Sequence, residues 1–146
     1  MIREGSRTDM EDITRVRTSV LENHMSVAQM AVIGITPDRI AAEMQAGDLG
    51  CWVAEHDGRV IAFAMADRRD GNIFALFVSP KHERQGFGSA LLARCESWLK
   101  ALGYATAKLN TGRGTRAYDF YLKRGWTLTG EKAGHFGDDN VLCKRL

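Results

Sequence analysis

The strongest hydrophobic pattern in the chain is an unbroken apolar run from Ile73 to Val78, followed by a helical repeat. A continuous run of this kind is typical of a strand that is covered on both faces. Pro80 ends the run because proline cannot donate a ladder hydrogen bond. Beyond Gly88, apolar residues at steps of three and four predict a long amphipathic helix that ends at Gly103. These residues are Leu91, Leu92, Cys95, Trp98, Leu99 and Leu102.

The rest of the pattern predicts an α/β fold, a mixed sheet flanked by helices, with the element order βααβββαβαββ. A Thr8–Glu11 capping box and Pro37 mark the starts of two early helices. Asp57-Gly58 is a strong hairpin signal. The expected strands are 2–4, 51–55, 60–65, 73–78, 105–110, 126–131 and 141–145, with a loop over 133–140 and a final short helix over 115–124. The strand at 105–110 should run parallel to the central one, since a helix connects them. No linker or repeat interrupts the pattern, which predicts one domain over 1–146.

The loop Arg84-Gln85-Gly86-Phe87-Gly88-Ser89 joins the central strand to the long helix. Small residues there expose the first amides of the helix, where the positive end of the helix dipole favours a phosphate. The loop is not a Walker A sequence, because no Gly-Lys-Ser/Thr follows, and it lacks the third glycine of the Rossmann fingerprint. Ser89 is not flanked as in the Gly-x-Ser-x-Gly nucleophile turn. A phosphate-bearing ligand is therefore the functional hypothesis, and a purely structural turn is the alternative.

Two segments resemble the signatures of the GNAT acetyltransferase superfamily. Phe77-Val78-Ser79-Pro80 followed by QGFGSALL at 85–92 resembles the acetyl-CoA signature, and AYDFYLKRGW at 117–126 resembles the second signature. Their order and spacing agree with that family over nearly the whole chain. Two positions depart from it: Glu83 stands where the family usually has Gln or Arg, and Gly114 stands where it often has Asn.

The resemblance implies acetyl-CoA as co-substrate, bound where the central strand and the 105–110 strand diverge. The pyrophosphate is expected on the amides of 84–89, and the pantetheine along the central strand, paired as an added strand. The implied binding residues are Phe77, Val78, Arg84, Gln85, Gly86, Phe87, Gly88, Ser89, Asn110 and Phe120. No metal is implied.

The resemblance also implies roles for two groups in acyl transfer. The tetrahedral oxyanion needs a preorganised donor, for which the Val78 amide is the candidate. The departing thiolate needs a proton, which the Tyr121 hydroxyl can supply because a phenol with a pKa of about 10 stays protonated at neutral pH. A plain core aromatic is the alternative interpretation of Tyr121. The signature segments contain no activated Cys or Ser with a partnered base, which favours direct transfer in a ternary complex.

The residues that would bind the acceptor amine are less clearly indicated by the sequence. Glu22 ends the first helix beside the apolar segment 23–35 and is a candidate to hold or deprotonate the amine; a solvated helix-end carboxylate is the alternative. Further candidates are Met25 and Met30 as pocket lining, His135, Asp138 and Asp139 as its rim, and Arg113 beside the coenzyme 3′-phosphate. Core filler and solvated turns are the alternatives for these residues.

Composition and charge exclude several classes of binding partner. A formal net charge of +2 with dispersed basic residues argues against nucleic acid, and no apolar run is long enough to span a membrane. Cys51, Cys95 and Cys143 are odd in number and lie in apolar contexts, as expected for reduced thiols of a cytoplasmic protein. The four histidines show no metal-ligand spacing.

The expected function is therefore an acetyl-CoA-dependent N-acetyltransferase acting on a primary amine of a small molecule or peptide. Two other classes stay open: a non-catalytic acyl-CoA-binding sensor of the same fold, and an interaction module that uses the 23–35 segment. The sequence leaves both a monomer and a homodimer open.

Overall fold

The computed structural model describes residues 1–21, 24–112, 115–134 and 137–146, without the side chains of 133, 134, 137 and 138. A seven-stranded mixed sheet in the order β1-β2-β3-β4-β5-β7-β6 forms its centre. The strands are β1 (Ile2–Glu4), β2 (Leu49–His56), β3 (Arg59–Asp67), β4 (Asn72–Val78), β5 (Thr106–Gly112), β6 (Thr127–Gly134) and β7 (Gly137–Arg145). The central apolar run is β4, in the middle of the sheet, which confirms the predicted fold class.

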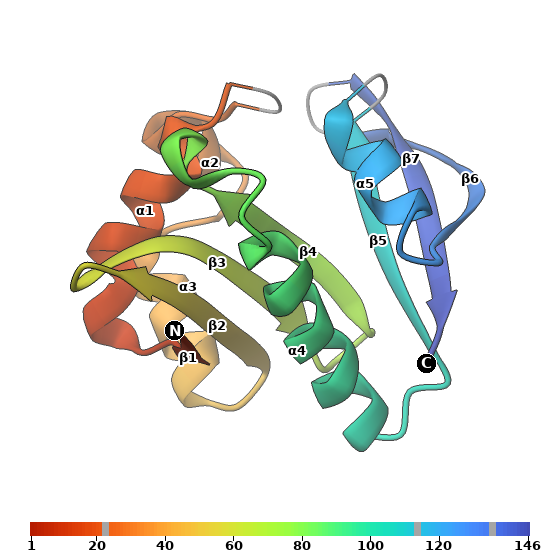
Figure 1. Ribbon diagram of the computed structural model, residues 1–146, viewed down its shortest axis with the longest axis horizontal. Coiled ribbons are helices and arrows are strands. Elements are labelled where there is room, and N and C mark those ends of the chain that lie inside the picture. The colour runs from red at the N-terminus through yellow and green to blue at the C-terminus, as the bar shows by residue number, and fades with distance from the viewer. Residues whose placement is uncertain (22–23, 113–114, 135–136) are drawn as a thin grey trace.

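Helices cover both faces of this sheet (Figure 1). They are α1 (Met10–Ser19), α2 (Val27–Val32), α3 (Pro37–Gln45), α4 (Phe87–Ala101) and α5 (Arg116–Leu122). One core cluster joins α4 and α5 to the sheet through buried residues such as Leu91, Cys95 and Tyr121. A second cluster, which includes Ile13 and Ile40, joins α1 and α3 to the opposite face. The two faces have separate cores because successive strand residues point to opposite sides.

The sheet opens between its two central strands. β4 and β5 are parallel, and they are paired only at Asn72 and Lys108, near the start of β4. By contrast, β3 pairs with β4 from Ala62 to Asp67. In Figure 1, β4 and β5 lie close at one end of the molecule and diverge towards the end where α2 and α5 lie. The carboxyl half of β4 therefore has a free edge, and the expected divergence of these strands is confirmed.

Most local signals led to the expected structure. Asp57 and Gly58 both have positive φ, 52° and 76°, as the predicted tight hairpin requires. Gly103 follows α4 with a φ of 99°, the left-handed conformation that ends a helix. Thr36 caps α3, because its hydroxyl accepts a hydrogen bond from the Arg39 amide.

Three local predictions were wrong. The capping box is formed by Ser6 and Asp9 rather than by Thr8 and Glu11, since a 3₁₀ turn at Arg7–Asp9 precedes α1. The expected element order has no helix in the apolar 23–35 segment, but this segment contains a short helix, α2, with its own Ser26–Gln29 capping box. The expected loop over 133–140 is mostly strand, because β6 and β7 stay paired up to Gly134 and Gly137.

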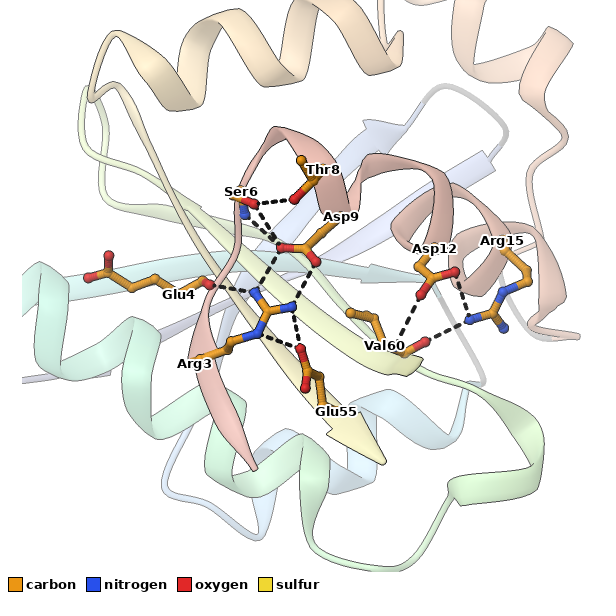
Figure 2. Close-up of polar contacts among 9 residues, drawn as sticks. All are labelled: Arg3, Glu4, Ser6, Thr8, Asp9, Asp12, Arg15, Glu55 and Val60. Atoms are coloured by element: carbon orange, nitrogen blue, oxygen red, sulfur yellow. Dashed lines mark hydrogen bonds and ion pairs between the residues drawn. The ribbon is translucent and has the colours of Figure 1, made fainter. Parts of the chain in front are cut away.

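The buried carboxylate of Asp9 and the guanidinium of Arg3 connect the start of the chain to β2. Arg3 donates two parallel hydrogen bonds to Asp9, 2.9 Å from Nη1 to Oδ2 and 2.8 Å from Nη2 to Oδ1. Its Nε also donates to Glu55 at 2.6 Å, so that one guanidinium joins β1, β2 and the entry to α1 (Figure 2). A second contact holds α1 to β3, since Asp12 accepts from the Val60 amide while Arg15 donates to the Val60 carbonyl.

Asp9→Asn is expected to lower the free energy of unfolding by about 2 kcal/mol at neutral pH, because the charge-assisted hydrogen bonds to Arg3 weaken. These bonds lower the pKa of Asp9 below its ordinary value of 3.8, although burial opposes the shift. A lowered pKa contributes stability above the unfolded value, and this contribution is lost as the pH falls through the folded one. The difference between wild type and variant in urea unfolding should thus be constant above about pH 5 and shrink below pH 4. Asp38→Asn is the control, since Asp38 is exposed and pairs loosely with Arg7; an equal loss in both variants would contradict the prediction.

Candidate active site

Two cavities meet at the opening between β4 and β5. The α4-side cavity, of about 630 Å³, lies between β4, the start of α4, β5 and α5. The α1-side cavity, of about 700 Å³, lies on the other face against α1, α2, α3 and β3. Six of the described residues line both of them: Phe74, Ala75, Phe77, Asn110, Gly112 and Thr115. The cavities are therefore two sides of one site, and the residues of the junction come from both halves of the sheet.

The free edge of β4 presents its backbone to this junction. The Ser79 amide donates to the Ile61 carbonyl at 2.8 Å, which makes Ile61 and Ser79 a hydrogen-bonded pair of the antiparallel ladder. Hydrogen-bonded and non-bonded pairs alternate, so Val78, opposite Ala62, is a non-bonded position. Its N–H and C=O point away from β3, towards the edge that β5 leaves open. The predicted oxyanion donor, the Val78 amide, therefore faces the site, whereas the backbone of Phe77 pairs with Phe63.

The loop before α4 forms one wall of the α4-side cavity. Gly86 is the N-cap residue of α4, with a φ of 87°, and Arg84 also has a positive φ of 62°. A Cβ at Gly88 would lie in ordinary van der Waals contact with the Phe120 ring, at 3.5 Å, so this position faces the space between α4 and α5. Of the predicted binding residues in this loop, Gln85 does not line the cavity and is exposed. The others line it: Arg84, Gly86, Phe87, Gly88 and Ser89.

Tyr121 lies on α5 and lines the α4-side cavity with only 7% of its surface exposed. Its ring contacts Phe120 and Trp126 edge to face. Burial raises the pKa of its phenol well above the ordinary value. None of the described residues forms a hydrogen bond with its hydroxyl. A protonated hydroxyl that lies beside the cavity is chemically able to donate a proton, and it is also part of the core.

Two pairs that link the region around the start of α4 to α5 and the turn after it were not predicted. The Arg124 guanidinium lies 3.6 Å over the centre of the Phe120 ring and donates to the Ser89 hydroxyl at 2.8 Å. Glu83, the position that departs from the family pattern, forms an ion pair with Arg116 at 3.3 Å. All five side chains line the cavity. A signal for these pairs was absent from the sequence, because their partners lie 35 and 33 residues apart and meet only in the folded protein.

The acceptor-side predictions have mixed outcomes. Met25, Met30 and Asp139 line the α1-side cavity, and Asp139 does so from β7 rather than from a loop. Glu22, Arg113, Gly114 and His135 lie outside the described residues, as does the side chain of Asp138. The structure adds Arg17 to this wall, which no sequence motif had indicated.

The two buried cysteines line neither cavity. Cys51 and Cys95 are free and buried. Burial raises the pKa of Cys51 to about 12 and raises that of Cys95 further, so that both remain neutral thiols near pH 7. A nucleophilic role requires the thiolate. Over the described part of the chain, the structure brings no three His, Cys, Asp or Glu side chains together as a metal-binding group. Among the same residues, no helix combines the length and the hydrophobicity that a membrane span requires.

Comparison with known proteins identifies the family. The model of the acetyltransferase (GNAT) family matches residues 19–126, and the chain belongs to this family. An uncharacterized N-acetyltransferase of Mycobacterium tuberculosis is 28% identical over 101 residues, which are 64% of this chain. The match spans only 65% of the relative.

Solved structures share the fold. The PaiA N-acetyltransferase of Thermoplasma acidophilum, in complex with coenzyme A, has a TM-score of 0.81 at 18% identity, with 100% of this chain and 98% of that one covered. A phosphinothricin acetyltransferase of Sinorhizobium meliloti, in complex with acetyl-CoA, has a TM-score of 0.77 at 22% identity and coverages of 100% and 88%.

Several features of the α4-side cavity fit a coenzyme A molecule. The first amides of α4, preceded by Gly86, can accept a phosphate. The free edge of β4 at Val78 can pair with an extended amide-bearing chain. Thr111 and His82 also line the cavity, but Thr111 Oγ1 and His82 Nδ1 are themselves buried and have no partner among the described residues. Neither atom is exposed to the cavity, so the fit rests on the amides of α4 and the free edge of β4.

Proposed function

We propose that this protein is an acetyl-CoA-dependent N-acetyltransferase that moves the acetyl group directly onto a primary amine in a ternary complex. The observation that carries the proposal is the junction of two cavities at the free edge of β4. Acetyl-CoA occupies the α4-side cavity, and the amine enters from the α1-side cavity. Both reactants can then meet beside Val78 without a covalent enzyme intermediate.

The residues of the site divide the chemistry as follows. The neutral amine attacks the thioester carbonyl, and the Val78 amide donates a hydrogen bond to the oxyanion that develops. The C–N bond forms and the C–S bond breaks. Tyr121 donates its proton to the departing sulfur, and the proton that the amine loses restores the phenol through solvent. The products are the acetylated amine and free coenzyme A.

The first test is coenzyme binding. Coenzyme A and acetyl-CoA are expected to raise the melting temperature, because a ligand that binds only the folded state adds roughly 2.7 kcal/mol at a hundredfold excess over its Kd. ADP and NAD⁺ serve as controls, since they offer a pyrophosphate without the pantetheine that pairs with β4. A melting curve that coenzyme A does not shift would exclude the assignment of the cavity. Thiol release with a panel of amines then separates an enzyme from a protein that binds acyl-CoA without turnover.

A further inference from the structure

The lining of the α1-side cavity indicates which kind of amine can bind there as the acceptor. This inference rests on the proposed function. The wall is mainly apolar, with methionine, isoleucine and phenylalanine side chains from α1, α2, α3, β3 and β4. Examples are Met10, Met30, Ile40, Phe63 and Met65, all nearly buried. A volume of about 700 Å³ is within the range of sites for small molecules. Such a wall favours an acceptor with a sizeable apolar group, since burying apolar surface drives its binding.

Two charged residues stand out among the described residues that line this cavity. Arg17 projects from α1, and Asp139 belongs to β7, in the other half of the sheet. The Arg17 guanidinium lies 4.2 Å from the centre of the Phe77 ring. Phe77 lines both cavities and directly precedes Val78. A positive charge therefore lies close to the reaction centre, and a negative charge lies on the opposite wall.

The position of Arg17 selects against acceptors that are only cationic. A polyamine or a lysine side chain would bring a second positive charge beside a guanidinium in an apolar wall, where repulsion is poorly screened. An acceptor with a carboxylate next to its amine would instead form a charge-assisted pair with Arg17. Burial lowers the pKa of Arg17 itself, as expected for a cation in this partly desolvated wall.

We propose that the acceptor is a free α-amino acid with an apolar side chain, whose carboxylate binds Arg17 and whose side chain occupies the methionine-lined part of the α1-side cavity. The amine then lies at the junction beside Val78, with Asp139 on the opposite wall to receive the ammonium before it loses its proton to solvent. The reaction converts the neutral amino group and acetyl-CoA into the N-acetyl amino acid and coenzyme A.

The test compares acceptors that differ only in the carboxylate. Thiol release from acetyl-CoA is measured with L-methionine, L-leucine and L-phenylalanine, with their amides, with a methionyl dipeptide and with spermidine. We expect kcat/KM for each free amino acid to exceed that for its amide by roughly 10- to 100-fold, the usual effect of a hydrogen bond to a charged group. Spermidine and the dipeptide should react no faster than the amides. Glycine should react poorly, because it leaves the apolar wall uncovered.

Arg17→Gln should remove the preference for free amino acids over their amides. In this variant the ratio of kcat/KM for the amino acids to kcat/KM for their amides should fall to about one, while the Kd for coenzyme A stays near wild type. Arg17→Lys should retain part of the preference, since it keeps the charge but not the planar pair of donors. Arg7→Gln is the matched control, because it removes one positive charge from an exposed side chain outside the cavity.

The outcomes distinguish the two proposals. Amides, the dipeptide or spermidine reacting as well as the amino acids in the wild type would overturn the acceptor class and leave the acetyltransferase proposal standing. An unchanged acid-to-amide ratio in Arg17→Gln would overturn the role of Arg17. If coenzyme A binds but no amine in the panel accelerates thiol release above hydrolysis, both proposals fail.

Discussion

Tyr121→Phe is expected to lower turnover by roughly 10²- to 10⁴-fold, the usual contribution of a general acid, with little change in affinity for acetyl-CoA. The substitution removes one oxygen atom and keeps the ring that contacts Phe120 and Trp126. Slow chemistry with intact binding identifies a group that acts mainly in the transition state. Steady-state thiol release with the best amine, together with titration of coenzyme A, measures both quantities.

The same variant separates the catalytic role of Tyr121 from a structural one. Because none of the described residues bonds its hydroxyl, the loss of the oxygen should change the stability by no more than about 1 kcal/mol. Tyr118→Phe is the matched control, since Tyr118 lies on the same helix, half-buried, and does not line the cavity. Burial raises the pKa of Tyr121, so the phenol remains protonated and the wild-type rate should not fall between pH 7 and 9. Equal turnover of Tyr121→Phe and wild type would remove Tyr121 from the mechanism.

Gly88→Asp is expected to weaken coenzyme A binding by at least about 100-fold without unfolding the protein. The new side chain projects towards Phe120 and Val78, into the space between α4 and α5. A carboxylate there repels the pyrophosphate, and like charges placed together in an interface cost several kcal/mol. Isothermal titration with coenzyme A and a urea melt measure the affinity and the stability of the same preparation.

The control for this prediction is Gly88→Ala. A Cβ at this position meets the Phe120 ring at 3.5 Å and the Val78 side chain at 3.8 Å, which are ordinary contacts, so alanine should fold and bind with only a small loss. Gly86→Asp should also lose binding. However, its positive φ of 87° adds a backbone strain of roughly 1–2 kcal/mol that Gly88 does not have. Wild-type affinity in Gly88→Asp would mean that the phosphates bind elsewhere.

The local elements of the site could be predicted from the sequence, because each depends on neighbours in the chain. The apolar run 73–78 became β4, and the repeat after Gly88 became α4. The Gly86 turn places the first amides of α4 at the cavity for the same reason. The failures were also local: the 3₁₀ turn at Arg7–Asp9 moved the capping box to Ser6, and strand pairing converted the expected 133–140 loop into β6 and β7.

The sequence by itself therefore determined the element types, the class of fold and the position of the glycine turn before α4, since these follow from hydrophobic period, turn residues and capping. Only the tertiary structure decided which groups face one another. The register of β3 against β4 turns the Val78 amide towards the open edge. The divergence of β4 and β5 joins two cavities into one site. Arg17 and Asp139 line one cavity although 121 intervening residues separate them in the chain, because sheet order and helix packing, which depend on contacts between distant segments, bring α1 and β7 to the same opening.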